Sequence, residues 1–132
     1  MKILILLIFA TFAFCGDVKW LSLKDAEALS KRENRIVMVE VSAHGCKYCV
    51  EMANTTLKND KITSKLNQYF APVLFYNDEG NVPPKFFAKG TPTFFFIDKN
   101  GKKLSAPIFG AWNATDFEFF LDLMLKKMKE QQ

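Results

Sequence analysis

Residues 36–42, which read IVMVEVS, narrow the choice of fold more than any other segment of the chain. The run is rich in β-branched residues and almost continuously apolar, a pattern typical of a strand that is covered on both faces. A sheet that contains such a strand needs a further layer of structure against each face. Helices usually provide these layers, so the run favours an α/β fold.

Segments with helical and extended patterns lie on both sides of this run. Helices are expected from an N-cap at Ser22 to about residue 33, over residues 46–57 and 60–69, and after a capping box at residues 115–118; further strands are expected at residues 72–76, 93–97 and 103–109. The last two strands flank the sequence DKNG, which suits a hairpin turn. This order of elements predicts a mixed sheet with helices on both faces.

The length and composition indicate one globular domain. The chain has 132 residues, and 49% of them are hydrophobic, including 14 phenylalanines, which is enough apolar area for a core in a small fold. The formal net charge of +4 comes from lysines scattered among acidic residues. Because nucleic-acid binding needs a clustered basic surface, we expect no nucleic-acid partner.

The N-terminal residues 1–15, MKILILLIFATFAFC, have the pattern of a targeting segment. Their apolar stretch, residues 3–14, would rise only about 18 Å as a helix, well short of the roughly 30 Å hydrocarbon core of a bilayer. We therefore expect a secretory signal peptide at 1–15, cleaved after Ala13 or Cys15, and a single domain at 17–132. Lipid attachment through Cys15 is the alternative, disfavoured by the large residue before it.

The residues that carry chemistry begin directly after the buried run. Cys46 and Cys49 lie at the start of an expected helix, where unpaired N–H groups and the helix dipole favour a thiolate. Lys47 adds a positive charge beside Cys46. A purely structural disulfide is one alternative, although it stabilises little across so short a loop. A zinc site is another, and it would consume all three cysteines and His44, the only histidine.

Glu40 is the only charged residue in the buried run. Burial should raise the pKa of its carboxyl group toward neutrality, which is the property that a general acid or base needs. It precedes Cys46 by six residues, so we expect it beneath the cysteine pair. An ion pair with a lysine or arginine is the alternative for Glu40. His44 either tunes the Cys46 thiolate when protonated or is a partly exposed loop residue.

Pro92 lies directly ahead of the expected strand at 93–97. Proline has no N–H for a sheet ladder, and an X-Pro bond is the usual site of a cis peptide. With this feature added, the chain resembles the thioredoxin superfamily over about residues 19–129. The matching segments are VEVSAHGCKYC at 39–49, the dipeptide Thr91-Pro92, and TFFFIDKNGK at 93–102.

The resemblance implies a thioredoxin-like α/β fold with a central mixed four- to five-stranded sheet flanked by helices on both faces. It also implies a thiol-disulfide oxidoreductase that works without a cofactor or metal. Cys46 would be the attacking thiolate, and Cys49 the more buried, resolving thiol. Glu40 would move the proton of Cys49 through water.

The same resemblance implies which residues meet the substrate, a protein or peptide disulfide. Pro92 would be the cis-proline opposite the cysteine pair, and the backbone of Thr91 would pair with an extended substrate peptide. Lys47 and Tyr48, between the two cysteines, are also expected to contact the substrate. We expect the protein to be a monomer that is exported to the bacterial periplasm. A membrane thiol-disulfide electron donor is its expected partner there.

The motif around the cysteines departs from the usual thioredoxin sequence Trp-Cys-Gly-Pro-Cys. Here residues 45–49 read GCKYC, and a tyrosine before the second cysteine is similar to secreted disulfide-isomerase domains and to periplasmic thioredoxins linked to sulfur oxidation. The direction of the reaction is therefore left open. The alternative function is a non-catalytic binding or scaffold module, in which Lys85, Phe86 and Phe87 would form a peptide-binding lip.

Overall fold

The computed structural model describes residues 16–132, so the expected signal peptide, with Cys15, lies outside the described residues. The elements, with η for short 3-10 turns, are α1 (Leu23–Glu33), β1 (Ile36–Ser42), α2 (Lys47–Asn54), η1 (Thr56–Lys58), α3 (Asp60–Tyr69), β2 (Phe70–Tyr76), η2 (Asn77–Glu79), η3 (Pro84–Phe86), β3 (Thr93–Ile97), β4 (Ile108–Phe109) and α4 (Ala114–Glu130). In this part of the chain no helix is both long and apolar enough to cross a membrane.

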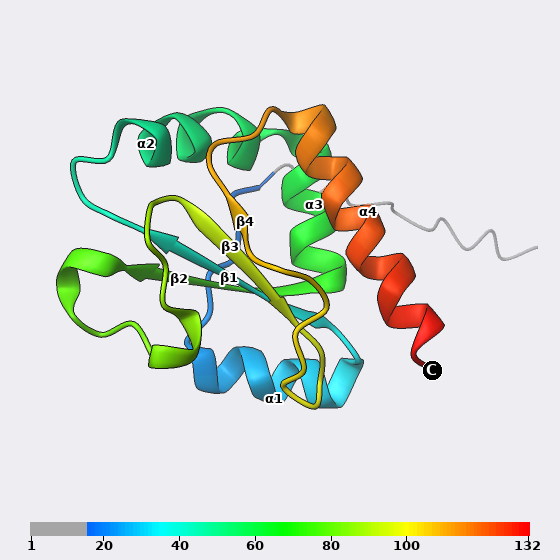
Figure 1. Ribbon diagram of the computed structural model, residues 1–132. Helices are drawn as coiled ribbons and strands as arrows, with labels where there is room; N and C mark the ends of the chain where they lie inside the picture. The colour runs from blue at the N-terminus through cyan, green and yellow to red at the C-terminus, as the bar shows by residue number, and fades with distance from the viewer. Residues whose placement is uncertain (1–15) are drawn as a thin grey trace, which may run out of the picture.

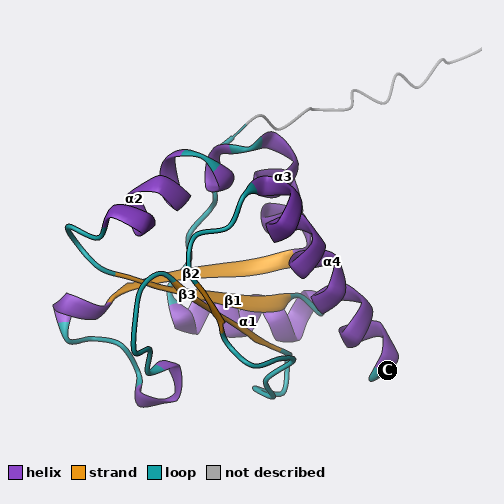
Figure 2. Cartoon of the chain, turned by 45° about the horizontal axis from the view of Figure 1, so that its top comes forward, coloured by secondary structure: helices purple, strands orange, loops and turns teal. Residues whose placement is uncertain are grey.

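The four strands form one mixed sheet in the order β2-β1-β3-β4 (Figure 1). β1 pairs in parallel with β2 and antiparallel with β3, and β3 pairs antiparallel with β4. All seven residues of β1 are buried, as its apolar sequence predicts. Helix α1 covers one face of the sheet, and α2, α3 and α4 lie on the other (Figures 1 and 2). The expected α/β fold is confirmed.

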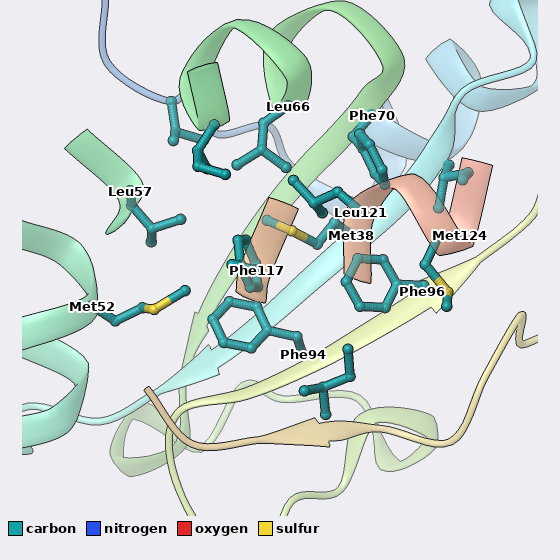
Figure 3. Packing of buried hydrophobic residues seen from close by; sticks show 14 of the residues in the cluster. Met38, Met52, Leu57, Leu66, Phe70, Phe94, Phe96, Phe117, Leu121 and Met124 are labelled. Atoms are coloured by element: carbon teal, nitrogen blue, oxygen red, sulfur yellow. The ribbon is translucent and has the colours of Figure 1, made fainter. Parts of the chain in front are cut away.

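Alternate residues of the central strands build two separate cores. Met38 and Phe94 face α3 and α4, where they pack with Phe117 and Leu121 (Figure 3). Val39 and its neighbours face the other way, toward α1 and η3. Burying one large apolar side chain stabilises a fold by about 1.5–3 kcal/mol, so the phenylalanine-rich composition supplies much of the stability of this small domain.

Three element boundaries differ from the sequence-based expectation. β2 begins at Phe70, two residues before the expected strand. Helix α2 ends at Asn54, because Thr55 leaves helical geometry at φ −117° and ψ −83° while its hydroxyl donates to the Glu51 carbonyl. The expected strand 103–109 is reduced to an isolated bridge from Lys103 to Ile97 and the two-residue β4. Pro107 has no N–H to donate to a ladder, which accounts for the interruption.

The capping box of α4 is formed by a different residue from the one expected. Asn113, not Thr115, is the N-cap, and its side chain accepts from the Asp116 N–H at 2.9 Å and donates to the Asp116 carboxylate at 2.8 Å. We therefore expect Asn113→Ala to lower the free energy of unfolding by about 1 kcal/mol, the usual value of an N-cap. Urea denaturation measures this. Thr115→Ala is the control, and a larger loss for Thr115→Ala than for Asn113→Ala would contradict the assignment.

Candidate active site

Cys46 occupies the N-cap position of α2, directly after the β1–α2 loop. Its sulfur accepts the N–H of Cys49 at 3.3 Å, and the two cysteines form a disulfide. Gly45, at φ +71°, lets the loop turn into the helix at a backbone conformation that favours glycine. Cys46 is partly exposed, whereas Cys49 is only 4% exposed. A thiolate at Cys46 therefore meets both an N–H donor and the positive end of the helix dipole.

The Thr91-Pro92 dipeptide faces this sulfur from the other side of the site. The Cys46 sulfur lies 3.6 Å from the Thr91 carbonyl oxygen, and the Thr91 hydroxyl lies 3.3 Å from the same sulfur. The Thr91–Pro92 peptide bond is cis, and the Pro92 carbonyl accepts the N–H of Gly110 at 2.8 Å. The fold thus brings together residues that are 45 positions apart in the sequence.

Glu40 lies in the middle of β1, between Leu74 of β2 and Phe94 of β3. It is 2% exposed, and burial raises the pKa of its carboxyl group to about 7. Within residues 16–132, no lysine or arginine makes an ion pair with Glu40. The alternative of an ion-paired, structural Glu40 thus receives no support. Burial alone accounts for the raised pKa of the Glu40 carboxyl group.

A cavity of about 310 Å³ is shared by Glu40 and Cys49. Both Glu40 and Cys49 line it, together with Ser42, Tyr76 and residues of α2 and the N-terminal segment. Asp17 and Trp20, which the sequence analysis did not single out, also line it. Such a space gives room for water between a buried acid and a buried thiol, so a proton can pass between them without direct contact.

The remaining candidate residues differ in how accessible they are. Lys47 is exposed beside Cys46, and Tyr48 is 60% exposed, so both can meet a partner molecule. Phe87 is 71% exposed, but Phe86 is fully buried and its ring packs against Phe95 at 5.4 Å between centroids. The expected lip of Lys85, Phe86 and Phe87 is therefore wrong for Phe86, which belongs to the core.

His44 has a partner, Asp78, that no local sequence pattern identifies. The backbone N–H and the ring Nδ1 of His44 both lie within 3.0 Å of the Asp78 carboxylate, which comes from η2 at the end of β2. Asp78 is 34 residues further along the chain. Only the pairing of β1 with β2, which places Ser42 beside Tyr76, brings these residues together.

Solved structures of other proteins share the fold of this chain. Among solved structures, a thioredoxin from Thermus thermophilus is 24% identical with a TM-score of 0.73, covering 86% of this chain and 91% of its own. A putative disulphide-isomerase from Bacteroides thetaiotaomicron is 18% identical with a TM-score of 0.68, covering 83% and 93%. The C-terminal domain of Neisseria meningitidis DsbD, in the oxidised form, is 24% identical with a TM-score of 0.59, covering 76% and 90%.

These structural similarities, at identities below a quarter, establish the fold. No curated protein matches the chain. The family model described as a thioredoxin-like domain matches residues 23–125, which span α1 to α4 and include both cysteines and Thr91-Pro92. The chain therefore belongs to the family of thioredoxin-like domains.

Proposed function

We propose that the protein is an exported thiol-disulfide oxidoreductase that exchanges disulfides of protein or peptide substrates through Cys46 and Cys49. The observation that carries the proposal is the position of the Cys46 sulfur at the N-terminus of α2, where it accepts the Cys49 N–H and faces Thr91. A partly exposed thiol in such a place has the properties of a reactive cysteine. Structural neighbours described as a DsbH oxidoreductase and a putative disulphide-isomerase support the same class of reaction.

In the reductive direction, the Cys46 thiolate attacks one sulfur of a substrate disulfide. The substrate S–S bond breaks, the departing sulfur leaves as a thiolate with the bonding electrons, and a mixed disulfide forms. Cys49 then loses its proton and attacks the Cys46 sulfur, which releases the second substrate thiolate. Two electrons have moved from the cysteine pair to the substrate, and Cys46–Cys49 is oxidised. The reverse sequence oxidises a substrate dithiol.

Glu40 is the acceptor for the Cys49 proton in this scheme. A carboxyl group with a pKa of about 7 exchanges protons readily at neutral pH, and the shared cavity provides a path through water. Thr91 and Pro92 would hold the backbone of the substrate opposite Cys46, and Lys47 and Tyr48 would contact its side chains. The positions of Thr91 opposite the sulfur and of Lys47 and Tyr48 beside it support these roles.

The N-terminal sequence and the cysteine chemistry together favour action outside the cytoplasm. Residues 1–15 have the pattern of a secretory signal, and disulfide substrates persist in oxidising compartments such as the bacterial periplasm. If the protein works as a reductase there, its disulfide must be reduced again after each turnover. A membrane thiol-disulfide donor is the class of partner that would do so.

The proposal predicts a Cys46 thiol of lowered pKa. A thiol of ordinary pKa, about 8.5, is only about 1% thiolate at pH 6.5. We expect Cys46 in the folded Cys49→Ser variant to react with iodoacetamide at pH 6.5 at least about tenfold faster than in the same variant unfolded in urea. The unfolded state is the matched control, because it keeps the cysteine and its neighbours in sequence but removes the helix. Equal rates would instead favour the scaffold function.

A further inference from the structure

His44, two residues before Cys46, is held by three groups from the end of β2 and the turn that follows. The Asp78 carboxylate accepts its backbone N–H at 3.0 Å and contacts its ring Nδ1 at 2.8 Å. Glu79 lies 3.8 Å from the other ring nitrogen. The imidazole also stacks on Tyr76, with 4.0 Å between ring centroids and an angle of 9° between planes.

These contacts hold the backbone of the β1–α2 loop as well as the His44 side chain. The hydrogen bond from the His44 N–H fixes the loop itself, and the Cys46 N–H donates to the Ala43 carbonyl at 3.4 Å within the same turn. Accepting the backbone N–H of His44, and next its ring N–H, lowers the pKa of Asp78, so the acceptor stays ionised. In Figures 1 and 2, the β1–α2 loop and the end of β2 lie at the same edge of the molecule.

We propose that His44 is a positioning residue for Cys46, and that the His44–Asp78 contact ties the β1–α2 loop to the end of β2 so that the N-terminus of α2 stays aimed at the Cys46 sulfur. The proposal rests on the redox role proposed above for the Cys46–Cys49 pair. A loop released from Asp78 would align the Cys49 N–H and the helix end less well with the sulfur. The Cys46 thiolate would then lose stabilisation, and the disulfide form would be favoured.

A purely electrostatic role makes a different prediction, because such a role requires a protonated His44, whose charge would be opposite to that of Asp78. If only charge mattered, removing a protonated His44 would destabilise a nearby thiolate, and removing the Asp78 carboxylate would stabilise it. If the tie matters, Asp78→Ala removes both the backbone and the ring contact, and His44→Ala removes the ring contact. Both substitutions then loosen the same loop, and both destabilise the thiolate. The directions of the two effects therefore separate the two roles.

The experiment measures the equilibrium of Cys46–Cys49 with glutathione for the wild type, His44→Ala, His44→Asn, Asp78→Ala and Asp122→Ala. Asp122 is the matched control. It is one of two carboxylates that contact Lys65 at the α3–α4 contact, just as Asp78 is one of two carboxylates that contact His44. His44→Asn keeps a short side chain with an N–H donor for Asp78. Circular dichroism checks that each variant is folded.

We expect His44→Ala and Asp78→Ala to shift the equilibrium at least about threefold toward the disulfide, which corresponds to about 15 mV more negative at about 30 mV per tenfold change. Asp122→Ala should stay at the wild-type value. His44→Asn should lie much closer to the wild-type equilibrium than His44→Ala does. Opposite shifts for His44→Ala and Asp78→Ala, or shifts of less than threefold, overturn the proposal. Failure to reduce any protein disulfide overturns the proposed function instead, since the equilibrium with glutathione is measurable in either case.

Discussion

Replacing Cys46 with serine is expected to abolish insulin reduction, lowering the rate to that of the reaction without protein. A serine hydroxyl is not ionised at neutral pH and cannot form a disulfide, so neither step of the exchange can begin. Cys46 is partly exposed and its sulfur faces Thr91, so it is the better placed of the two cysteines to meet a substrate. Cys49, only 4% exposed, cannot replace it as the attacking group.

Replacing Cys49 with serine should have a different outcome. Cys46 can still attack, but nothing resolves the intermediate, so the reaction stops at a mixed disulfide between Cys46 and the substrate. Non-reducing electrophoresis and intact mass would show this adduct for Cys49→Ser and none for Cys46→Ser or the double variant. Turnover by Cys46→Ser at the wild-type rate would end the enzyme interpretation, and an adduct through Cys49 would reverse the two roles.

The same assay with glutathione determines the direction of the reaction, which the geometry leaves open. A cysteine pair with a strongly reducing potential would favour a reductase that receives electrons from a membrane donor. A pair with an oxidising potential would favour disulfide formation in substrates. The difference depends on how much the fold stabilises the Cys46 thiolate relative to the disulfide.

The parts of the fold that could be predicted from sequence are those with strong local patterns. The apolar run of β1 and the spacing of apolar residues in α3 were sufficient to place both elements within their observed bounds. Boundaries that depend on a single competing interaction were missed. Thr55 ends α2 early, Pro107 interrupts the last strand, and Asn113 takes the N-cap of α4 from Thr115.

In the candidate site, features within one sequence segment could likewise be predicted, whereas contacts between distant segments could not. Cys46 and its helix lie within one short segment, and the rise in the pKa of Glu40 followed from a lone acid in a buried run. The Asp78 contact with His44 depends on the parallel pairing of β1 with β2, so no local pattern reveals it. Trp20 likewise reaches the wall of the cavity only through the packing of the N-terminal segment.

Glu40 should make the stability of the oxidised protein depend on pH near neutrality. Burial raises its pKa from 4.5 to about 7 in the folded state. Below pH 4.5 the carboxyl group is protonated in both the folded and the unfolded protein and has no effect. Between the two values the unfolded chain loses its proton first, so the free energy of unfolding falls as the pH rises. Above pH 7 the full cost applies, about 3 kcal/mol at 1.36 kcal/mol per pKa unit.

Glu40→Gln removes this ionisation while keeping a polar side chain of the same size. We expect the stability of the variant relative to the wild type to increase by about 3 kcal/mol between pH 4.5 and pH 8, measured by urea denaturation of both oxidised proteins. Glu51→Gln, at an exposed position of α2, is the control, and its relative stability should change by less than about 0.5 kcal/mol. If the wild type and Glu40→Gln depend on pH in parallel, Glu40 does not titrate in this range. It could not then exchange protons with Cys49 at neutral pH, and the buried acid would have no part in the reaction.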